Sequence, residues 1–111
     1  MKHQYDSENA TLQLTAEGDV TSTNVDSMRY ELEDIYEKTS TSHKKKWSLL
    51  ILDLSKSQMV DSAGLNLIIS IVKRNKASGA EIKIITSSPL VHRVLTFTRL
   101  SKEVNIVLNK K

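Results

Sequence analysis

Hydrophobic residues follow two different periods along this chain, and segments of one period alternate with segments of the other. Apolar residues that alternate with polar ones or run unbroken predict strands at 11–16, 48–54, 81–86 and 104–108, with a weaker candidate at 2–6. Apolar residues three and four positions apart predict helices at 25–38, at 62–77 and from Pro89 to about Arg99. A loop is expected at 39–46, where serine, threonine and lysine predominate. Strands that alternate with helices predict an α/β layer with parallel pairing and right-handed crossovers.

The helix starts carry local signals that agree with these periods. Ser22, Thr23 and Asn24 offer N-cap side chains to the first helix, and Ser88 followed by Pro89 is a typical helix start. The helix at 62–77 is apolar over so much of its circumference that we expect it to be covered on more than one side. That breadth is compatible with either a monomer or a weak homodimer.

Length, charge and cysteine content narrow the class of protein. The chain has 111 residues, a net charge of +3 and no cysteine, so we expect a single domain over residues 1–111 without disulfides. No apolar run approaches the roughly 18 residues that a membrane span needs, and the polar N-terminus shows no signal peptide. We therefore expect a cytoplasmic protein with no membrane contact.

The basic residues do not form a nucleic-acid motif. The lysine runs at 44–46 and 110–111 are interpreted as a solvated loop and a tail, because a binding face would interleave basic with aromatic residues. Trp47 follows the first run, but it also precedes a predicted buried strand. We expect no nucleic-acid partner.

A short polar turn, Asp61-Ser62-Ala63-Gly64, lies just before the second helix and is the strongest candidate site. In the structural interpretation, Asp61 or Ser62 caps the helix, which contributes about 1 kcal/mol, and Gly64 allows close approach of helix and strand. In the functional interpretation, Ser62 is a phosphorylation switch. A helix N-terminus tolerates the added charge of about −2, whereas an interface packed on that site does not.

An enzymatic role for Ser62 finds no support in the sequence. A serine nucleophile needs a base in reach and a third group that orients it, and none of His3, His43 and His92 has a signature spacing to Ser62. No cluster of metal-ligating residues appears, and the three glycines form no phosphate loop. We therefore predict no enzyme, no metal and no cofactor.

Short motifs on both sides of the turn occur in a characteristic order. Asp-Ser-x-Gly-Leu at 61–65 is preceded by Leu-Asp-Leu at 52–54 and followed by Lys-Arg at 73–74, Gly79, the segment 89–95 and Leu100. From about Thr11 to Ile106 this series resembles the STAS domain, which is typified by bacterial anti-sigma factor antagonists. The resemblance implies a single STAS-like domain with a mixed, mostly parallel sheet of four to five strands and helices packed mainly on one face.

The resemblance also implies a regulatory function. STAS antagonists bind an anti-sigma factor that is also a serine kinase, and the kinase ends binding by phosphorylating the serine after the motif aspartate. A serine phosphatase reverses this. The serine corresponds to Ser62 and the aspartate to Asp61. The partner-binding face would comprise Asp61, Ser62, Ala63 and Gly64 together with Ser22, Thr23 and Asn24. The segment at 17–20 resembles the family's Gly-x-x-Asp region only loosely.

A second function stays open, namely that of a non-phosphorylated STAS adaptor in a transport or sensory complex. In that case Ser62 is only a cap and the domain docks by an apolar helix surface. Replacing Ser62 by alanine would then cost roughly 1 kcal/mol of stability, and replacing it by glutamate would leave partner binding intact.

Overall fold

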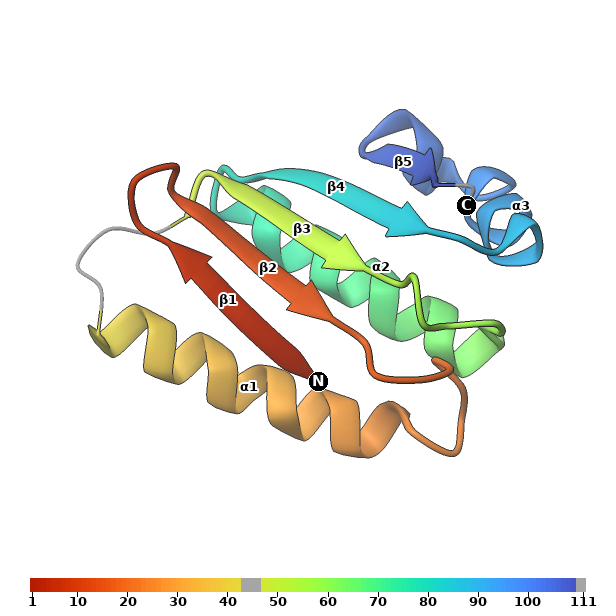
Figure 1. Ribbon diagram of the computed structural model, residues 1–111, viewed down its shortest axis with the longest axis horizontal. Coiled ribbons are helices and arrows are strands. Elements are labelled where there is room, and N and C mark those ends of the chain that lie inside the picture. The colour runs from red at the N-terminus through yellow and green to blue at the C-terminus, as the bar shows by residue number, and fades with distance from the viewer. Residues whose placement is uncertain (43–46, 110–111) are drawn as a thin grey trace.

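The computed structural model describes residues 1–42 and 47–109, without the side chains of 40–42. The strands are β1 (Lys2–Asp6), β2 (Thr11–Thr15), β3 (Leu49–Asp53), β4 (Glu81–Thr86) and β5 (Asn105–Leu108). The helices are α1 (Val25–Ser42), α2 (Ser62–Ala77), α3 (Pro89–Thr96) and the short 3-10 helix η1 (Arg99–Lys102). Figure 1 shows α1 and α2 running alongside the sheet. Every predicted strand is present, and each boundary lies within one residue of the predicted one.

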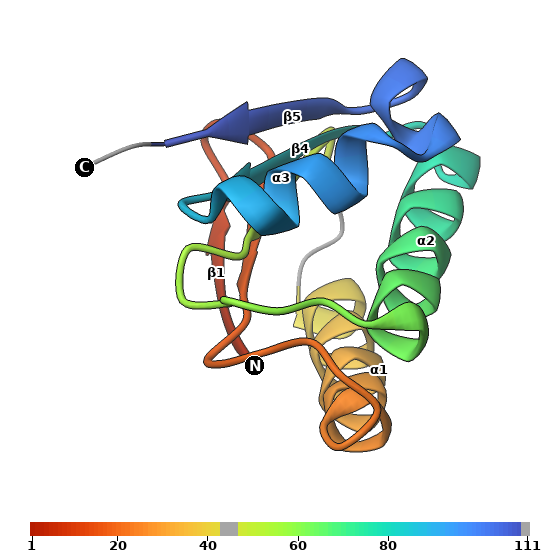
Figure 2. The same ribbon diagram turned by 90° about the vertical axis from the view of Figure 1, so that its right-hand side faces the viewer.

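The strands form one five-stranded sheet in sequence order, β1-β2-β3-β4-β5. β1 pairs antiparallel with β2, and each later pair is parallel. Every parallel connection moves one strand in the same direction, so right-handed crossovers place α1, α2 and α3 on the same face of the sheet. Figure 2 shows α1 and α2 together on one side of it. The predicted fold class, a mixed and mostly parallel sheet with helices on one face, is confirmed.

The covered face of the sheet consists of alternate residues from the three central strands. These side chains are at most 4% exposed, and they are Leu12, Leu14, Leu50, Leu52, Ile82 and Ile84. Leu12 pairs in register with Leu50, and Leu50 with Ile82, so equivalent side chains lie in rows across the sheet. Burial of each such side chain contributes about 1.5–3 kcal/mol. The residues between them face the opposite side and are mostly half-buried.

The wide apolar surface of α2 is buried inside the domain. Its residues Leu67, Ile68, Ile71 and Val72 are at most 3% exposed. The helix contacts both β4 and α1, so it is covered from two directions, as the sequence predicted. The breadth of α2 therefore gives no argument for a homodimer, and the oligomeric state stays a prediction.

A buried polar cluster ties α1, α2 and the start of β3 together. The Asn75 amide Nδ2 donates to Tyr36 Oη at 3.1 Å, and Trp47 Nε1 donates to Asn75 Oδ1 at 2.7 Å. The Trp47 and Tyr36 rings are stacked with centroids 5.9 Å apart. Burial raises the pKa of the Tyr36 hydroxyl. Trp47, although it follows the lysine run, packs against the domain's own core.

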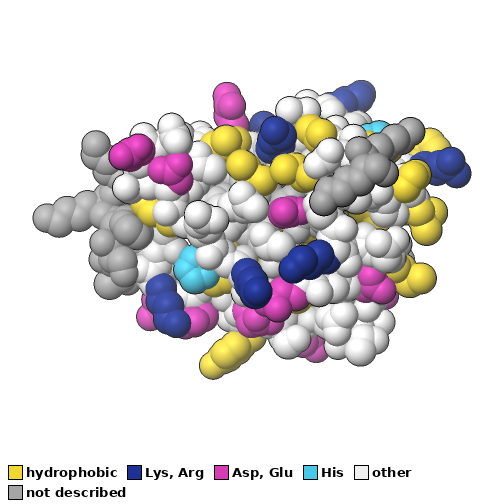
Figure 3. Space-filling model, viewed as in Figure 1, with side chains coloured by type: hydrophobic (Ala, Val, Ile, Leu, Met, Phe, Trp, Pro, Cys, Tyr) yellow, Lys and Arg dark blue, Asp and Glu magenta, His cyan; other side chains and the backbone are white. Residues whose placement is uncertain are grey.

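The outer surface carries charges of both signs. Figure 3 shows Lys and Arg side chains beside Asp and Glu side chains on the face that it presents. Lys38 Nζ lies 3.0 Å from Asp34 Oδ2, and Arg74 Nη1 lies 2.6 Å from Glu33 Oε1. Exposed pairs of this kind contribute roughly 0–1 kcal/mol each.

Two helix ends differ from the prediction. α1 continues to Ser42, so the predicted loop is wrong for 39–42, while 43–46 lie outside the described residues. The helix continues because Thr39, only 5% exposed, extends the buried stripe of Ile35 and Tyr36. α3 ends at Thr96 rather than near Arg99.

The end of α3 has a local cause in Thr98. Its hydroxyl donates to the carbonyl of Leu95 at 2.6 Å and accepts the N–H of Leu100 at 3.2 Å. Thr98 is thereby the N-cap of η1, with an extended backbone that the α-helix cannot include.

Candidate functional site

The predicted site lies where β2 and β3 end. These neighbouring strands are parallel, so the loops that follow them, at 16–24 and 54–61, leave the same edge of the sheet. Figure 1 shows the two loops and the start of α2 at one end of the molecule. Ligands and partners of open α/β sheets commonly bind beyond the carboxyl ends of the strands.

Main-chain hydrogen bonds join the two loops. Val20 and Val60 form an isolated parallel bridge. The N–H of Val20 donates to Met59 O at 3.0 Å, and the N–H of Asp61 donates to Val20 O at 3.3 Å. The segment before the Ser62 turn is therefore held against residues 39 to 41 positions earlier in the chain.

Two side chains strengthen this connection. The Asp19 carboxylate accepts the N–H groups of Gln58 and Met59 at 2.8 and 3.2 Å. The fully buried Ser57 donates its hydroxyl to Gly18 O at 2.7 Å. Sequence reasoning missed both residues, because nothing in the spacing of Asp19 and Ser57 indicates that their loops meet. The available signal was the weak family-like segment at 17–20.

Asp61 is the N-cap of α2. Its Oδ1 accepts the N–H of Gly64 at 2.8 Å, while its Oδ2 accepts the N–H of Ser22 at 2.8 Å. Both bonds lower the pKa of the Asp61 carboxyl, because they favour its charged form. The bond from the Gly64 N–H has the larger effect and the bond from the Ser22 N–H the next largest. One carboxylate thus caps the helix and holds the loop before α1.

Gly64 is required by the closeness of this packing. A Cβ atom at this position would lie 1.8 Å from Val20 O and 2.6 Å from Val20 C. No side chain fits there without moving backbone. The close approach predicted for Gly64 is therefore confirmed, but its neighbour is the loop after β2 rather than a strand.

Ser62 is the first residue of α2, and its side chain is exposed. Among the hydrogen bonds of residues 1–42 and 47–109, none involves its hydroxyl. The hydroxyl therefore does not cap the helix. The expectation that Ser62 itself caps is wrong, because Asp61 already takes the N–H of the third helical residue. Ala63, next to it, is half-buried.

The other predicted site residues lie in the turn before α1. The N–H of Ser22 reaches the Asp61 carboxylate, so this residue does meet the Ser62 turn. Thr23 is exposed beside it. The Asn24 amide donates to Asp19 O at 2.8 Å and so supports the loop. Main-chain bonds from Asn24 and Val25 to Thr21 O, at 2.8 and 3.0 Å, close the turn that starts the helix.

One apolar side chain of this region was not predicted from sequence. Met59, in the loop that leads to Ser62, is 53% exposed. Its backbone is fixed by the bonds to Val20 and Asp19. The surface around Ser62 thus combines exposed hydroxyls, the Asp61 carboxylate and the exposed Met59 thioether on a backbone held by hydrogen bonds.

Within residues 1–42 and 47–109, no three His, Cys, Asp or Glu side chains gather as they would around a metal ion. In the same ranges, no helix combines the length and apolarity that crossing a bilayer requires.

Comparisons with known proteins agree with this geometry. The family model of the STAS domain matches residues 3–111. The crystal structure of TM1081, a proposed anti-sigma factor antagonist from Thermotoga maritima, matches with a TM-score of 0.73 and 21% identity, over 95% of this chain and 83% of that one. The anti-sigma factor antagonist SpoIIAA in its unphosphorylated form matches with a TM-score of 0.66 and 13% identity, over 98% of this chain and 88% of that one.

At these identities the solved structures establish a shared fold. The match to the family model extends over nearly all of the chain, from the first strand to the last residue. The mixed five-stranded sheet with its helices also matches the fold of these antagonist structures. This chain therefore belongs to the STAS domain family.

Proposed function

We propose that this chain is an anti-sigma factor antagonist that binds a serine-kinase anti-sigma factor and is switched off by phosphorylation at Ser62. The observation that carries the proposal is an exposed hydroxyl on the first residue of α2, directly after the capping Asp61. Family membership and the shared fold with anti-sigma factor antagonists support the class of partner.

A phosphate on Ser62 is compatible with the fold. It adds a charge of about −1.5 to −2, and the free amides and dipole at the N-terminus of a helix stabilise an anion there. The bonds that hold the turn are made by Asp61 and by main-chain groups rather than by the Ser62 hydroxyl. Phosphorylation therefore breaks no described side-chain bond, and the modified protein is expected to stay folded.

The same phosphate would alter the surface that a partner meets. Exposed Ser22, Thr23 and Met59 surround a turn whose one charge is the Asp61 carboxylate. A phosphate beside that carboxylate makes the turn strongly acidic, and a partner that desolvates it must then bury uncompensated negative charge. Gly64 is buried, so its part in the binding face is to set the shape of the turn.

The assignment of the site is tested by incubating the protein with its cognate serine kinase and ATP and measuring phosphate by mass spectrometry. Wild type should gain one phosphate, which a serine phosphatase should remove. Ser62→Ala should gain none. Ser22→Ala is the matched control, since Ser22 is an exposed serine of the same surface, and it should be modified like wild type. Phosphate on Ser62→Ala would refute the assignment.

The switch itself is tested by binding. Ser62→Glu should fold normally by circular dichroism but bind the kinase at least about tenfold more weakly, because like charges in an interface cost several kcal/mol. Ser101→Glu, which places the same charge on the exposed side of η1, should bind as wild type does. Unchanged affinity of Ser62→Glu would contradict a phosphorylation switch.

A constitutive adaptor role is the second candidate, and α3 is the feature that favours it. Leu90 of α3 is 55% exposed, and Phe97, the C-cap residue that follows the helix, is 83% exposed. They lie seven positions apart, about two helical turns, and so fall on the same side. An adaptor that docks by this surface should lose its partner in Phe97→Ser and keep it in Ser62→Glu. An antagonist should show the opposite pattern in a pull-down.

A further inference from the structure

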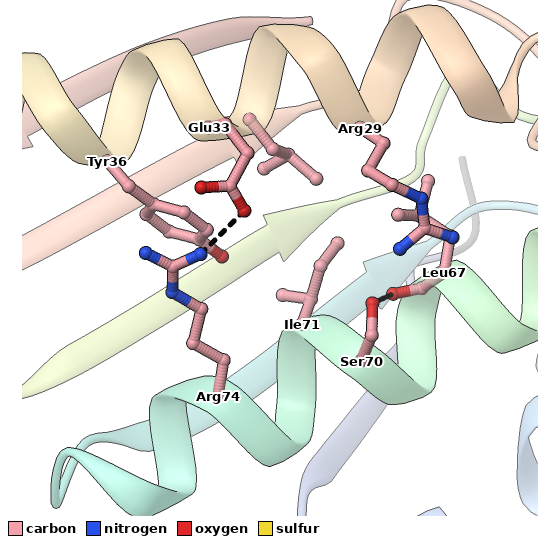
Figure 4. Close-up of a pocket in the computed structure, with 8 residues that line it drawn as sticks. Arg29, Glu33, Tyr36, Leu67, Ser70, Ile71 and Arg74 are labelled. Atoms are coloured by element: carbon pink, nitrogen blue, oxygen red, sulfur yellow. Dashed lines mark hydrogen bonds and ion pairs between the residues drawn. The ribbon is translucent and has the colours of Figure 1, made fainter.

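A hollow of about 150 Å³ lies between α1 and α2, further along α2 than the Ser62 turn. Its floor consists of Leu32, Leu67 and Ile71, which are at most 3% exposed. Figure 4 shows Arg29 of α1 and Arg74 of α2 above this floor, with their guanidinium groups turned toward the space between the helices. An apolar floor under two guanidinium groups is the arrangement that an amphipathic anion requires.

Arg74 is held in place by other residues of the hollow. Its Nη1 lies 2.6 Å from Glu33 Oε1, and its guanidinium carbon lies 4.1 Å from the centroid of the Tyr36 ring. Tyr36 is itself fixed by its hydrogen bond with Asn75. Arg74 is therefore held as a fixed wall of the hollow, with Glu33 as its partner.

Arg74 forms an ion pair with Glu33, whereas Arg29 forms none with the described residues. Among the ion pairs within residues 1–42 and 47–109, none includes Arg29, although it lines the same hollow. The lining carries two guanidinium groups and one carboxylate, that of Glu33, so its net charge is positive. A planar guanidinium binds a carboxylate or a phosphate through two parallel N–H groups.

We propose that this hollow binds a small organic anion, with a ring-sized apolar body on Leu32, Leu67 and Ile71 and one carboxylate or phosphate on Arg29. The volume supports an occupant of this size, since a cavity of about 150 Å³ in another protein accommodates benzene. The site is separate from Ser62, so the proposal goes beyond the phosphorylation switch.

The test is a titration followed by amide chemical shifts in nuclear magnetic resonance spectra. Phenyl phosphate and benzoate carry the two head groups on one ring, inorganic phosphate is the head group alone, and benzyl alcohol is the uncharged ring. Titration to about 10 mM covers the Kd of about 1 mM expected for ligands of this size. At least one of the aromatic anions should saturate with shifts at residues 29–36 and 67–74, and the other two probes should bind at least fivefold more weakly.

Variants of the two charged side chains should act in opposite directions. Arg29→Gln should weaken binding about five- to tenfold through loss of a charge-assisted pair. Glu33→Gln should tighten it about twofold by removing a nearby negative charge. Arg93→Gln, an exposed arginine on α3, is the matched control and should leave the Kd unchanged. Ser62→Ala should also leave it unchanged, so this test fails or succeeds independently of the proposed switch.

Three results would overturn the proposal. The first is the absence of saturation by both aromatic anions. The second is equal binding to wild type and Arg29→Gln. The third is a set of shifts confined to residues 61–65, which would place the anion at the start of α2 instead of in the hollow.

Discussion

Replacing Gly64 by alanine tests whether the loop after β2 and the start of α2 form one rigid unit. The added Cβ would lie 1.8 Å from Val20 O, whereas an ordinary contact begins near 3.4 Å, so the two backbones must separate by more than 1 Å. Both backbones are fixed, since Asp61 N–H donates to Val20 O and the Asp61 carboxylate bonds Gly64 N–H and Ser22 N–H.

The size of the effect follows from three contributions. Overpacking at a site that cannot relax costs about 1–3 kcal/mol, and loss of a main-chain bond adds about 1 kcal/mol. Alanine is favoured over glycine within a helix by about 1 kcal/mol, which partly offsets these costs. We therefore expect Gly64→Ala to lower the free energy of unfolding by about 1–3 kcal/mol.

The assay is urea unfolding followed by the fluorescence of Trp47, the only tryptophan of the chain. The denaturation midpoint should fall while the m-value stays constant, which would indicate an effect on the folded state. Gly18→Ala is the control, because its added Cβ meets nothing within 4 Å, and it should change stability by less than about 0.5 kcal/mol. An equal or higher stability of Gly64→Ala would refute the rigid packing of Gly64 on Val20.

Three further predictions concern side chains of the site and the core. Ser62→Ala should change the free energy of unfolding by less than about 0.5 kcal/mol in chemical denaturation, because Asp61 is the cap. Asp61 has a lowered pKa in the folded state, so its contribution to stability is present above the ordinary carboxyl pKa of 3.8 and is lost as pH falls through the lowered value. The melting temperature of wild type should therefore exceed that of Asp61→Asn at pH 7, and the difference should shrink as the pH is lowered below about 4. Asn75→Ala should cost about 2–3 kcal/mol in urea unfolding, because it leaves Trp47 Nε1 and the Tyr36 hydroxyl without their partner. Full stability of Asn75→Ala would show that the cluster can re-form its hydrogen bonds without this amide.

The sequence by itself determined the strands, the presence of three α-helices and the position of the turn at 61–64. These features depend on hydrophobic period and on caps, which act over a few residues and can be read locally. The α/β class followed from the alternation of the two periods. The mixed sheet with one-sided helices came from the resemblance to the STAS domain. That resemblance also favoured Ser62 as a phosphorylation site, which its place at a helix start had already suggested.

Only the tertiary structure decided which side chains serve the site. Asp61 and Ser62 are both residue types that cap helices well, and in the structure Asp61 is the cap. Its second carboxylate oxygen accepts the N–H of Ser22, 39 positions away. Contacts between loops so far apart leave no local period in the sequence, so Asp19 and Ser57 could not be predicted to connect them.

Contacts between distant segments also explain where α1 ends. Serine and threonine have low helix propensity, so the sequence predicted a loop from residue 39. Burial of Thr39 against the core extended the helix, because tertiary packing outweighs propensities of a few tenths of a kcal/mol. Patterns along the chain thus fixed which segments fold into which elements, and packing between distant segments determined where α1 ends, why Gly64 must be glycine and why the Ser62 hydroxyl is left exposed.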